Sequence, residues 1–330
     1  MPLALGPLFE GLPVPSADHP IYSVVPVPGY PAYFIRKDNN ANVCVLIAAP
    51  DREARRHVPI RLESLEVVFE IPSIIKQAGK VSEETFTVVR CRSNNAEIVR
   101  YFLSVGETLL RILGPNPSRV AIGDAITRLA HIFQRMQSPA TRSVNGLFGE
   151  LFLIRQSRNP FRTLAAWRTQ NTSRFDFNAG SVRVDVKTAG GRQRIHSFSY
   201  DQCNPPSGTT AVAASLFVER AAGGASLREL IRDIEALVAT NTELVLKLHE
   251  TVAETLGRSL HEALSVRFDH RLSASSLQFY DLRSIPAVRN EPPPGVSDIH
   301  FRSDLSSVPQ ADTRRLVERE PSLGDFLPES

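Results

Sequence analysis

A short run of alternating valines and charged residues constrains the fold of this chain more than any other segment. Residues 182–187 read Val-Arg-Val-Asp-Val-Lys. Side chains along a strand point alternately to opposite faces. The run therefore predicts a strand with one apolar face toward a core and one wholly ionic face, which is either a solvated surface or a site for charged ligands.

The segment just before this strand adds a second acidic residue. Residues 174–178 predict another strand, in which Asp176 points away from Phe175 and Phe177. A hairpin turning at 178–181 would bring Asp176 beside Asp185. Two neighbouring carboxylates repel each other unless a cation lies between them, and oxygen ligands suit a hard ion such as Mg²⁺.

Lys187 stands out because the chain otherwise favours arginine. Lysine and arginine together number 38, and the only lysines are Lys37, Lys76, Lys80, Lys187 and Lys247. An ammonium group is a compact charge that can release its proton when desolvated, whereas a guanidinium group cannot. A single acid-x-Lys triplet is also expected by chance, so Asp185 and Lys187 need support from elsewhere in the chain.

That support comes from an upstream helix. Residues 142–157 predict a helix that is apolar nearly all round and therefore buried. At 100° per residue, Glu150 points between Leu153 and Ile154. A buried carboxylate needs a partner, and a metal site would provide one.

The remaining periodicity predicts an α/β (α+β) protein of two parts. Short β-rich segments before residue 92 predict a small antiparallel domain with a trailing helix over 1–115. Helices interleaved with strands follow over 116–305, including a strand at 194–200, and this order predicts one mixed central sheet. Residues 306–330 are expected to form a loosely ordered tail.

Several classes of protein are excluded or disfavoured. No apolar run approaches the roughly 20 residues of a membrane span, and the first basic residue is Arg36, so neither a membrane anchor nor a secretory signal is expected. Three distant cysteines fit a reducing, cytoplasmic setting. ATPase, serine hydrolase and zincin motifs are absent from the sequence.

The acidic residues and lysine, in this order, resemble the PD-(D/E)XK nuclease superfamily. The closer similarity is to bacterial PD-(D/E)XK-motif proteins often encoded beside phage-defence genes. It covers most of residues 30–305 and rests on these segments: G-L-F-G-E-L at 146–151, Trp167, Asp176-Phe177, V-D-V-K at 184–187, H-S-F-S at 196–199 and Gln202. Phe175 replaces the proline that names the superfamily, which removes no ligand.

The resemblance implies a restriction-endonuclease-like core with the order α-β-β-β-α-β. It also implies hydrolysis of a phosphodiester with Mg²⁺, for which Mn²⁺ can substitute. Asp176 and Asp185 would hold the metal, with Glu150 as a further ligand or an orienter of water. Lys187 would position or deprotonate the attacking water.

Less specific candidates surround this set. His196 could contact the phosphate or carry a proton, although a lone histidine on a strand more often packs. Gln202 and four arginines are candidate contacts to nucleic acid, or the rim of a solvated hairpin: Arg174, Arg183, Arg192 and Arg194.

The leading hypothesis is a Mg²⁺-dependent DNA endonuclease in bacterial defence against phage or in restriction. The alternative is a module of the same fold that no longer cuts and binds nucleic acid or a partner protein. Expected partners are DNA, other subunits of a defence system including a separate ATPase, and in one arrangement a second copy of the chain. The β-rich domain also carries a group of basic residues, which indicates either contact with nucleic acid or an ordinary solvent-exposed face of the sheet. These residues are Arg36, Lys37, Arg52, Arg55, Arg56 and Arg61.

Overall fold

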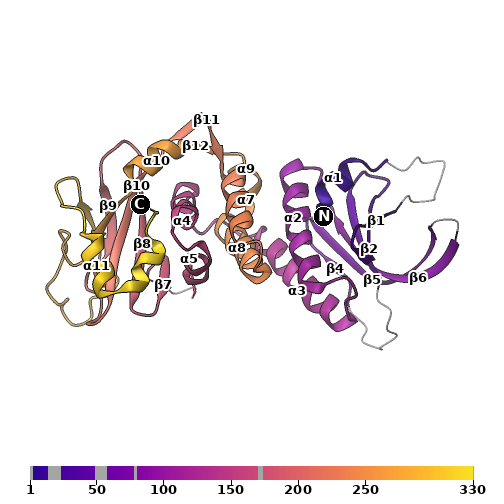
Figure 1. The fold of residues 1–330 in the computed structure, drawn as a ribbon, viewed down its shortest axis with the longest axis horizontal. Helices are drawn as coiled ribbons and strands as arrows, with labels where there is room; N and C mark the ends of the chain where they lie inside the picture. Colours follow the sequence, from indigo (N-terminus) through magenta and orange to yellow (C-terminus); the bar gives the residue numbers. More distant parts are fainter. Residues whose placement is uncertain (1–2, 14–23, 49–57, 78–79, 170–173, 330) are drawn as a thin grey trace. The chain divides into compact units, whose positions relative to one another are not determined.

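The computed structural model describes residues 3–13, 24–48, 58–77, 80–169 and 174–329. It is a mixed α/β protein with several sheets (Figure 1). No helix within these ranges is long and apolar enough to cross a lipid bilayer.

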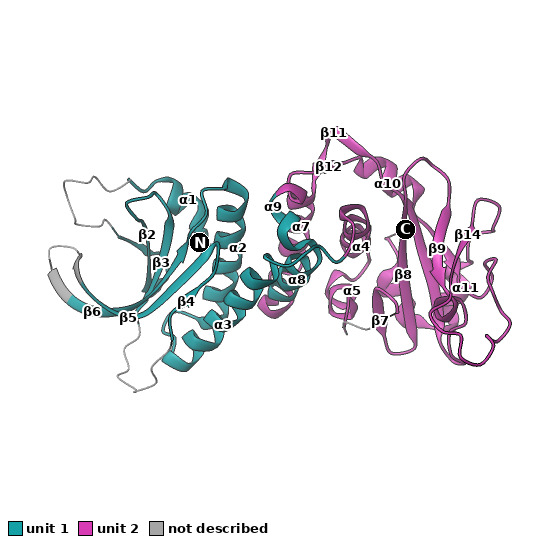
Figure 2. Cartoon of the chain, turned by 180° about the vertical axis from the view of Figure 1, so that it is seen from behind, with its two compact units in different colours: residues 1–141, 245–261 teal, residues 142–244, 262–330 magenta. Residues whose placement is uncertain are grey.

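The chain divides into two compact units that do not follow the predicted boundary at residue 115. The first unit consists of residues 1–141 and 245–261, and the second of residues 142–244 and 262–330 (Figure 2). Helices α3 (Arg119–Arg135) and most of α8 (Thr242–Leu256) therefore belong with the β-rich part. An amphipathic stripe shows that a helix is covered on one side, but it does not show which element covers it.

The first unit is built on a six-stranded antiparallel sheet. Its strands are β1 (Val25–Val27), β2 (Tyr30–Lys37), β3 (Val43–Ala48), β4 (Ile60–Arg61), β5 (Leu65–Gln77) and β6 (Lys80–Cys91), in the order β1-β2-β3-β6-β5-β4. The predicted antiparallel sheet is confirmed, although β3 pairs with β6 and so interrupts the meander. Helix α1 (Leu5–Glu10) precedes the sheet, and α2 (Ala96–Leu113) and α3 follow it.

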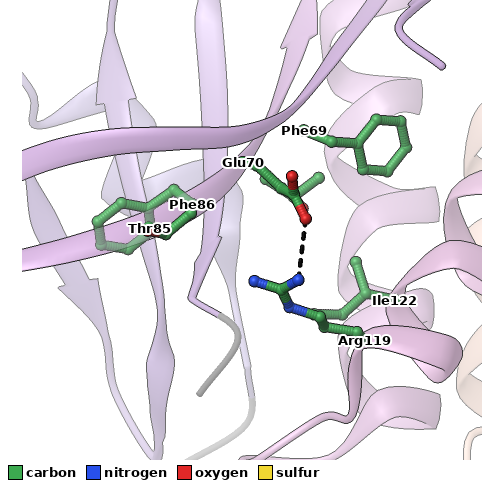
Figure 3. A pocket seen from close by; sticks show the side chains of 7 residues that line it. Phe69, Glu70, Thr85, Phe86, Arg119 and Ile122 are labelled. Atoms are coloured by element: carbon green, nitrogen blue, oxygen red, sulfur yellow. Dashed lines mark hydrogen bonds and ion pairs between the residues drawn. The ribbon is translucent and has the colours of Figure 1, made fainter. Parts of the chain in front are cut away.

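A bulge in β5 lies beside a small pocket of this unit, which is lined by Phe69, Glu70, Thr85, Phe86, Thr87, Arg119 and Ile122. The register of β5 against β6 shifts between Val68 and Ile71, and Glu70 there has a φ of 58°. The Glu70 carboxylate lies 2.8 Å from Arg119 Nη1 at the start of α3 (Figure 3). The ion pair thus joins the bulge to the helix beside the sheet.

The second unit is built on a mixed four-stranded sheet in the order β13-β10-β8-β7. These strands are β7 (Phe177–Ala179), β8 (Val182–Ala189), β10 (Thr210–Phe217) and β13 (Gln278–Asp281). Strand β10 is parallel to β8 and antiparallel to β13, and β7 is antiparallel to β8. Helices α4 (Val144–Gln156), α5 (Pro160–Ala166) and α7 (Leu227–Leu237) belong to the same unit, and a capping box of Ser226 and Glu229 begins α7.

The strand predicted at 194–200 forms but does not join this sheet. It is β9 (Ile195–Ser199), which pairs with β14 (His300–Asp304). A parallel pair needs a connection that returns the chain to the same end of the sheet. Strand β9 and helix α6 (Tyr200–Cys203) lie on the connection between β8 and β10. The other short elements are β11 (Arg220–Ser226), the 3₁₀ turn Gly257–Ser259, α9 (Leu260–Ala263), β12 (Arg267–Phe268) and α10 (His270–Ser276).

The prediction of a loosely ordered tail is wrong. Helix α11 (Thr313–Arg319) and a 3₁₀ segment (Pro321–Phe326) follow β14, and Leu323 and Phe326 are buried. The backbone N–H of Arg158 donates to Leu327 O at 2.8 Å, and that of Asn159 donates to Asp325 O at 3.1 Å. Elements this short are below the length at which hydrophobic periodicity is informative.

Candidate active site

The predicted hairpin between β7 and β8 is present. Phe177 pairs with Val184 and Ala179 with Val182, and Gly180 in the turn has a φ of 54°. Asp176 immediately precedes β7, so this register places it opposite Asp185. Its Oδ2 accepts a hydrogen bond from the backbone N–H of Val186 at 2.8 Å, which fixes the carboxylate against β8.

Asp185 and Lys187 form an ion pair within β8. Lys187 Nζ lies 2.7 Å from Asp185 Oδ2. Asp185 is only 4% exposed, so the ionic side of this strand is not a solvated surface at this position. Burial raises the pKa of the Asp185 carboxyl to about 7, against the lowering effect of Lys187 and with the added repulsion of Asp176. The carboxylate form of Asp185 thus depends on a nearby cation.

Gln202 on α6 holds both members of this pair. Its Oε1 accepts from the backbone N–H of Ser199 at 3.1 Å in a capping box, which assigns the amide oxygen to that side. Its Nε2 then donates to Asp185 Oδ1 at 2.9 Å and to the carbonyl of Arg174 at 2.7 Å. Lys187 Nζ lies 3.5 Å from the same Oε1. A short helix therefore sets the orientation of the Asp185 carboxylate.

Glu150 lies on the buried helix α4, as predicted, and is 2% exposed. Arg168 grips both of its oxygens, with Nε 2.9 Å from Oε2 and Nη2 2.8 Å from Oε1. Trp167 Nε1 donates to Oε2 at 2.6 Å. Burial raises the pKa of Glu150, and Asp176 adds to this rise while Arg168 and Arg142 oppose it.

Arg142 connects Glu150 to Asp176. Its Nη1 lies 2.5 Å from Asp176 Oδ1 and 3.3 Å from Glu150 Oε1. The Arg142 side chain is 43% exposed, whereas the Arg168 side chain is 14% exposed. Three acidic side chains thus face three basic ones: Glu150, Asp176 and Asp185 with Arg142, Arg168 and Lys187.

Comparison with known families agrees with this arrangement. Residues 8–306 match the family model described as "Putative PD-(D/E)XK family member, (DUF4420)". The chain belongs to this family. No curated protein and no solved structure matches the chain.

Nucleases of the PD-(D/E)XK superfamily usually use a divalent metal ion, and two residues of this DUF4420 member fit that use. The hard oxygen donors of Asp176 and Asp185 suit Mg²⁺, which commonly binds one or two carboxylates and keeps several waters. Asp185 Oδ2 is buried and lies 2.7 Å from Lys187 Nζ. A metal ion bound to Asp185 Oδ2 would share this oxygen with Lys187.

Glu150 does not fit the role of metal ligand that the sequence predicts. Both of its oxygens are occupied by the Arg168 fork, Trp167 and Arg142. Consistent with this, no group of three His, Cys, Asp or Glu side chains in the described ranges is placed to hold a metal ion. Glu150 instead anchors the two arginines that border the site.

His196 takes the packing alternative rather than the catalytic one. It is 3% exposed, and its Nε2 lies 2.8 Å from Ser215 Oγ. Burial, reinforced by Lys187 and Arg194, lowers the pKa of His196 to about 4. A histidine that stays neutral at ordinary pH and is closed off from solvent does not suit a proton carrier.

The structure also removes Arg194 from the candidate nucleic-acid contacts. Its guanidinium is buried, donates to Ser215 and Ser276, and stacks over Phe217 and Tyr280. Gln202 belongs to the acidic site itself. Arg194 and Gln202 therefore make their contacts within the second unit.

The other three predicted arginines lie nearer the surface. Arg174 and Arg192 have side chains 66% and 68% exposed and pair with Asp201 and Glu219, respectively. Arg183 Nη1 donates to backbone carbonyls of its own hairpin. Arg174 and Arg192 are therefore exposed enough to meet a phosphate backbone.

Basic residues of the first unit differ in availability. Lys37 Nζ donates to Leu12 O at 2.7 Å and lies over the Phe9 ring, so it fastens the start of the chain to the sheet. Arg61 is exposed and pairs with Glu66. Arg52, Arg55 and Arg56 fall outside the described residues.

Two functional contacts were not predicted from the sequence. Arg142 lies one residue before Ser143, the N-cap of α4, and Arg168 follows Trp167 after α5. Arg142 is the first residue of the helix predicted over 142–157, but the sequence pattern singled out neither arginine as part of the acidic site. Their salt-bridge partners are distant in sequence, and only the path of the chain brings them together.

Proposed function

We propose that this protein is a metal-dependent endonuclease that hydrolyses phosphodiester bonds in DNA. The observation that carries the proposal is the ion pair of buried Asp185 with Lys187, opposite Asp176 at the end of a hairpin in a chain of the PD-(D/E)XK family. Buried groups with perturbed pKa values that also face one another are typical of functional sites. The restriction-endonuclease-like core topology is part of the same proposal.

Asp176 and Asp185 would hold the metal ion. When bound, a divalent ion polarises a phosphoryl oxygen and lowers the pKa of its water. Lys187 places an ammonium group beside Asp185, where it can orient the attacking water and stabilise negative charge on the phosphate. Gln202 holds Asp185 in the orientation that keeps its Oδ2 toward Lys187.

Exposed arginines near the site would bind the DNA backbone. The carbonyl of Arg174 is fixed by Gln202, so the Arg174 side chain starts from the edge of the acidic site. Phosphate contacts of this kind position a nucleic acid without reading its sequence. Binding should therefore weaken as ionic strength rises.

The direct test is a cleavage assay with the purified full chain. Supercoiled plasmid, linear duplex, single-stranded DNA and RNA would each be incubated with Mg²⁺, with Mn²⁺ or with EDTA. We expect cleavage of DNA with either metal and none with EDTA. Asp185→Asn should abolish it, and Lys187→Arg should abolish it because a guanidinium fork cannot replace a compact ammonium group.

Asp233→Asn is the matched control for Asp185→Asn. Asp233 is a half-exposed acid of α7 in the same unit, paired with Arg155. Its replacement should leave cleavage at the wild-type level. Cleavage by Asp185→Asn would refute the site, and absence of cleavage by the wild type on every substrate would favour the alternative of a binding module.

The resemblance also supports a role in defence against phage, which we include in the proposal. Bacteria that carry the gene with its neighbouring genes should plate phage less efficiently than bacteria without them. The same genes with Asp185→Asn should restore plating. Equal protection by the variant would show that defence against phage does not depend on cleavage at this site.

A further inference from the structure

Arg142 occupies the acidic site from the solvent side. It belongs to the segment just before α4, and its guanidinium reaches the two carboxylates of Glu150 and Asp176. Burial lowers the pKa of Arg142, but the negative charges of Asp176, Glu150 and Asp185 together outweigh burial and raise it. One guanidinium group therefore lies in the field of all three acidic side chains.

Each carboxylate oxygen of Asp176 already has one partner. Oδ1 is 2.5 Å from Arg142 Nη1, and Oδ2 accepts from the backbone N–H of Val186. The backbone N–H is part of the hairpin and cannot leave without opening it. A metal ion that binds Asp176 through Oδ1 must therefore compete with Arg142.

The two arginines of the site differ in their freedom to move. Arg168 grips Glu150 with two hydrogen bonds, stacks near the Trp167 ring and is 14% exposed. Arg142 uses a single nitrogen for both of its ion pairs and is 43% exposed. Because the more exposed guanidinium can be hydrated again when it leaves the carboxylates, Arg142 is the cation that can be displaced.

We propose that Arg142 is a resident counter-cation that competes with the divalent metal for Asp176. In the metal-free protein it neutralises the carboxylates of Glu150 and Asp176, which would otherwise repel each other. When a metal binds, the guanidinium leaves Asp176 and the ion takes its place. The inference rests on the proposed metal site, and it predicts that Arg142 weakens metal binding.

The test is isothermal titration of Mn²⁺ into the full chain without DNA. Arg142→Gln should bind Mn²⁺ about 10- to 100-fold more tightly than the wild type, the range expected for loss of one competing charge-assisted hydrogen bond. Arg142→Lys should lie between them, because an ammonium group keeps the charge without reaching both carboxylates in the same way. The metal-free Arg142→Gln protein should melt at a lower temperature and gain more in Tm from Mn²⁺.

Arg155→Gln is the matched control. Arg155 lies at the other end of α4, is 39% exposed and pairs with Asp233 outside the site. It should bind Mn²⁺ as the wild type does. A circular dichroism spectrum would establish that each variant is folded, and Arg142→Lys keeps the test decisive if Arg142→Gln does not fold.

The outcomes distinguish this inference from the proposed function. Equal or weaker Mn²⁺ binding by folded Arg142→Gln or Arg142→Lys would overturn the competition while leaving the metal site in place. Absence of Mn²⁺ binding in the wild type and in all variants would overturn both. Loss of binding in Asp176→Asn, together with tighter binding in Arg142→Gln, would support both.

Discussion

Gly149 of helix α4 lies so close to Thr188 of strand β8 that a Cβ atom on the glycine would be 2.4 Å from Thr188 Cγ2. The same atom would be 3.1 Å from Val186 Cγ1. Glycine at this position therefore allows the helix that carries Glu150 to rest directly on the strand that carries Asp185 and Lys187.

Gly149→Ala should destabilise the protein. Overpacking of a dense core costs about 1–3 kcal/mol, which exceeds the gain of up to roughly 1 kcal/mol from better helix propensity. Urea denaturation followed by circular dichroism would measure the change. Gly106→Ala is the control, because a Cβ atom there meets only Leu5 Cδ1 at 3.6 Å, an ordinary contact, and should be neutral or stabilising.

Replacing Asp185 and replacing Lys187 should change the stability of the protein in opposite directions. Asp185→Asn removes a buried carboxylate that Asp176 and Glu150 repel, so the Tm of the metal-free protein should stay the same or rise. Lys187→Met leaves that carboxylate without its cation, so the Tm should fall. Thermal melts of both single variants and the double variant at pH 8 would check this. The double variant should be more stable than Lys187→Met alone, and a strictly additive result would contradict the coupling.

The closing segment of the chain should contribute strongly to stability. Phe326 is 1% exposed, and its ring lies 6.0 Å from the ring of Phe177, the residue after Asp176. Phe326→Ala should cost about 3–5 kcal/mol, the usual range for a buried phenylalanine. Phe161→Ala, at a position 36% exposed on α5, should cost less than about 1 kcal/mol in the same denaturant titration. Equal small effects would show that the segment is not docked in solution.

His196 predicts a loss of stability in mild acid. Its folded pKa is lowered from 6.5 to about 4, so between these values the unfolded chain binds a proton that the folded chain does not. The free energy of unfolding is therefore highest above pH 6.5 and falls as the pH drops toward 4, by at most about 3 kcal/mol from this group. Urea titrations across this range should show a shallower decline for His196→Gln. His300→Gln, at an exposed histidine, should decline as the wild type does.

Local pattern predicted the elements on which the acidic residues lie. Alternation over residues 182–187 predicted β8, and the turn at Gly180 predicted the hairpin that places Asp176 opposite Asp185. The run of apolar residues around Glu150 predicted a buried helix, which α4 is. These features depend on neighbours within a few residues, and side-chain periodicity reports such neighbours directly.

The salt-bridge partners of these acidic residues could not be predicted from local pattern. Nothing in the spacing of the sequence pairs Glu150 with Arg168 or Asp176 with Arg142, and the predicted metal role of Glu150 gives way to contacts made by Trp167 and the two arginines. Salt bridges between distant segments depend on the path of the chain, which periodicity does not contain.

The sequence alone therefore determined which side chains would be acidic, which strand and helix would carry them and which faces would be apolar. Only the tertiary structure decided what covers those faces and what neutralises those charges: β9 pairs outside the central sheet, the segment after residue 306 packs beside α5 and β7, and Arg142 lies against Asp176. The physical reason is that the local sequence decides which side chains must be buried or neutralised. The groups that cover or neutralise them come from whichever segments the fold brings close.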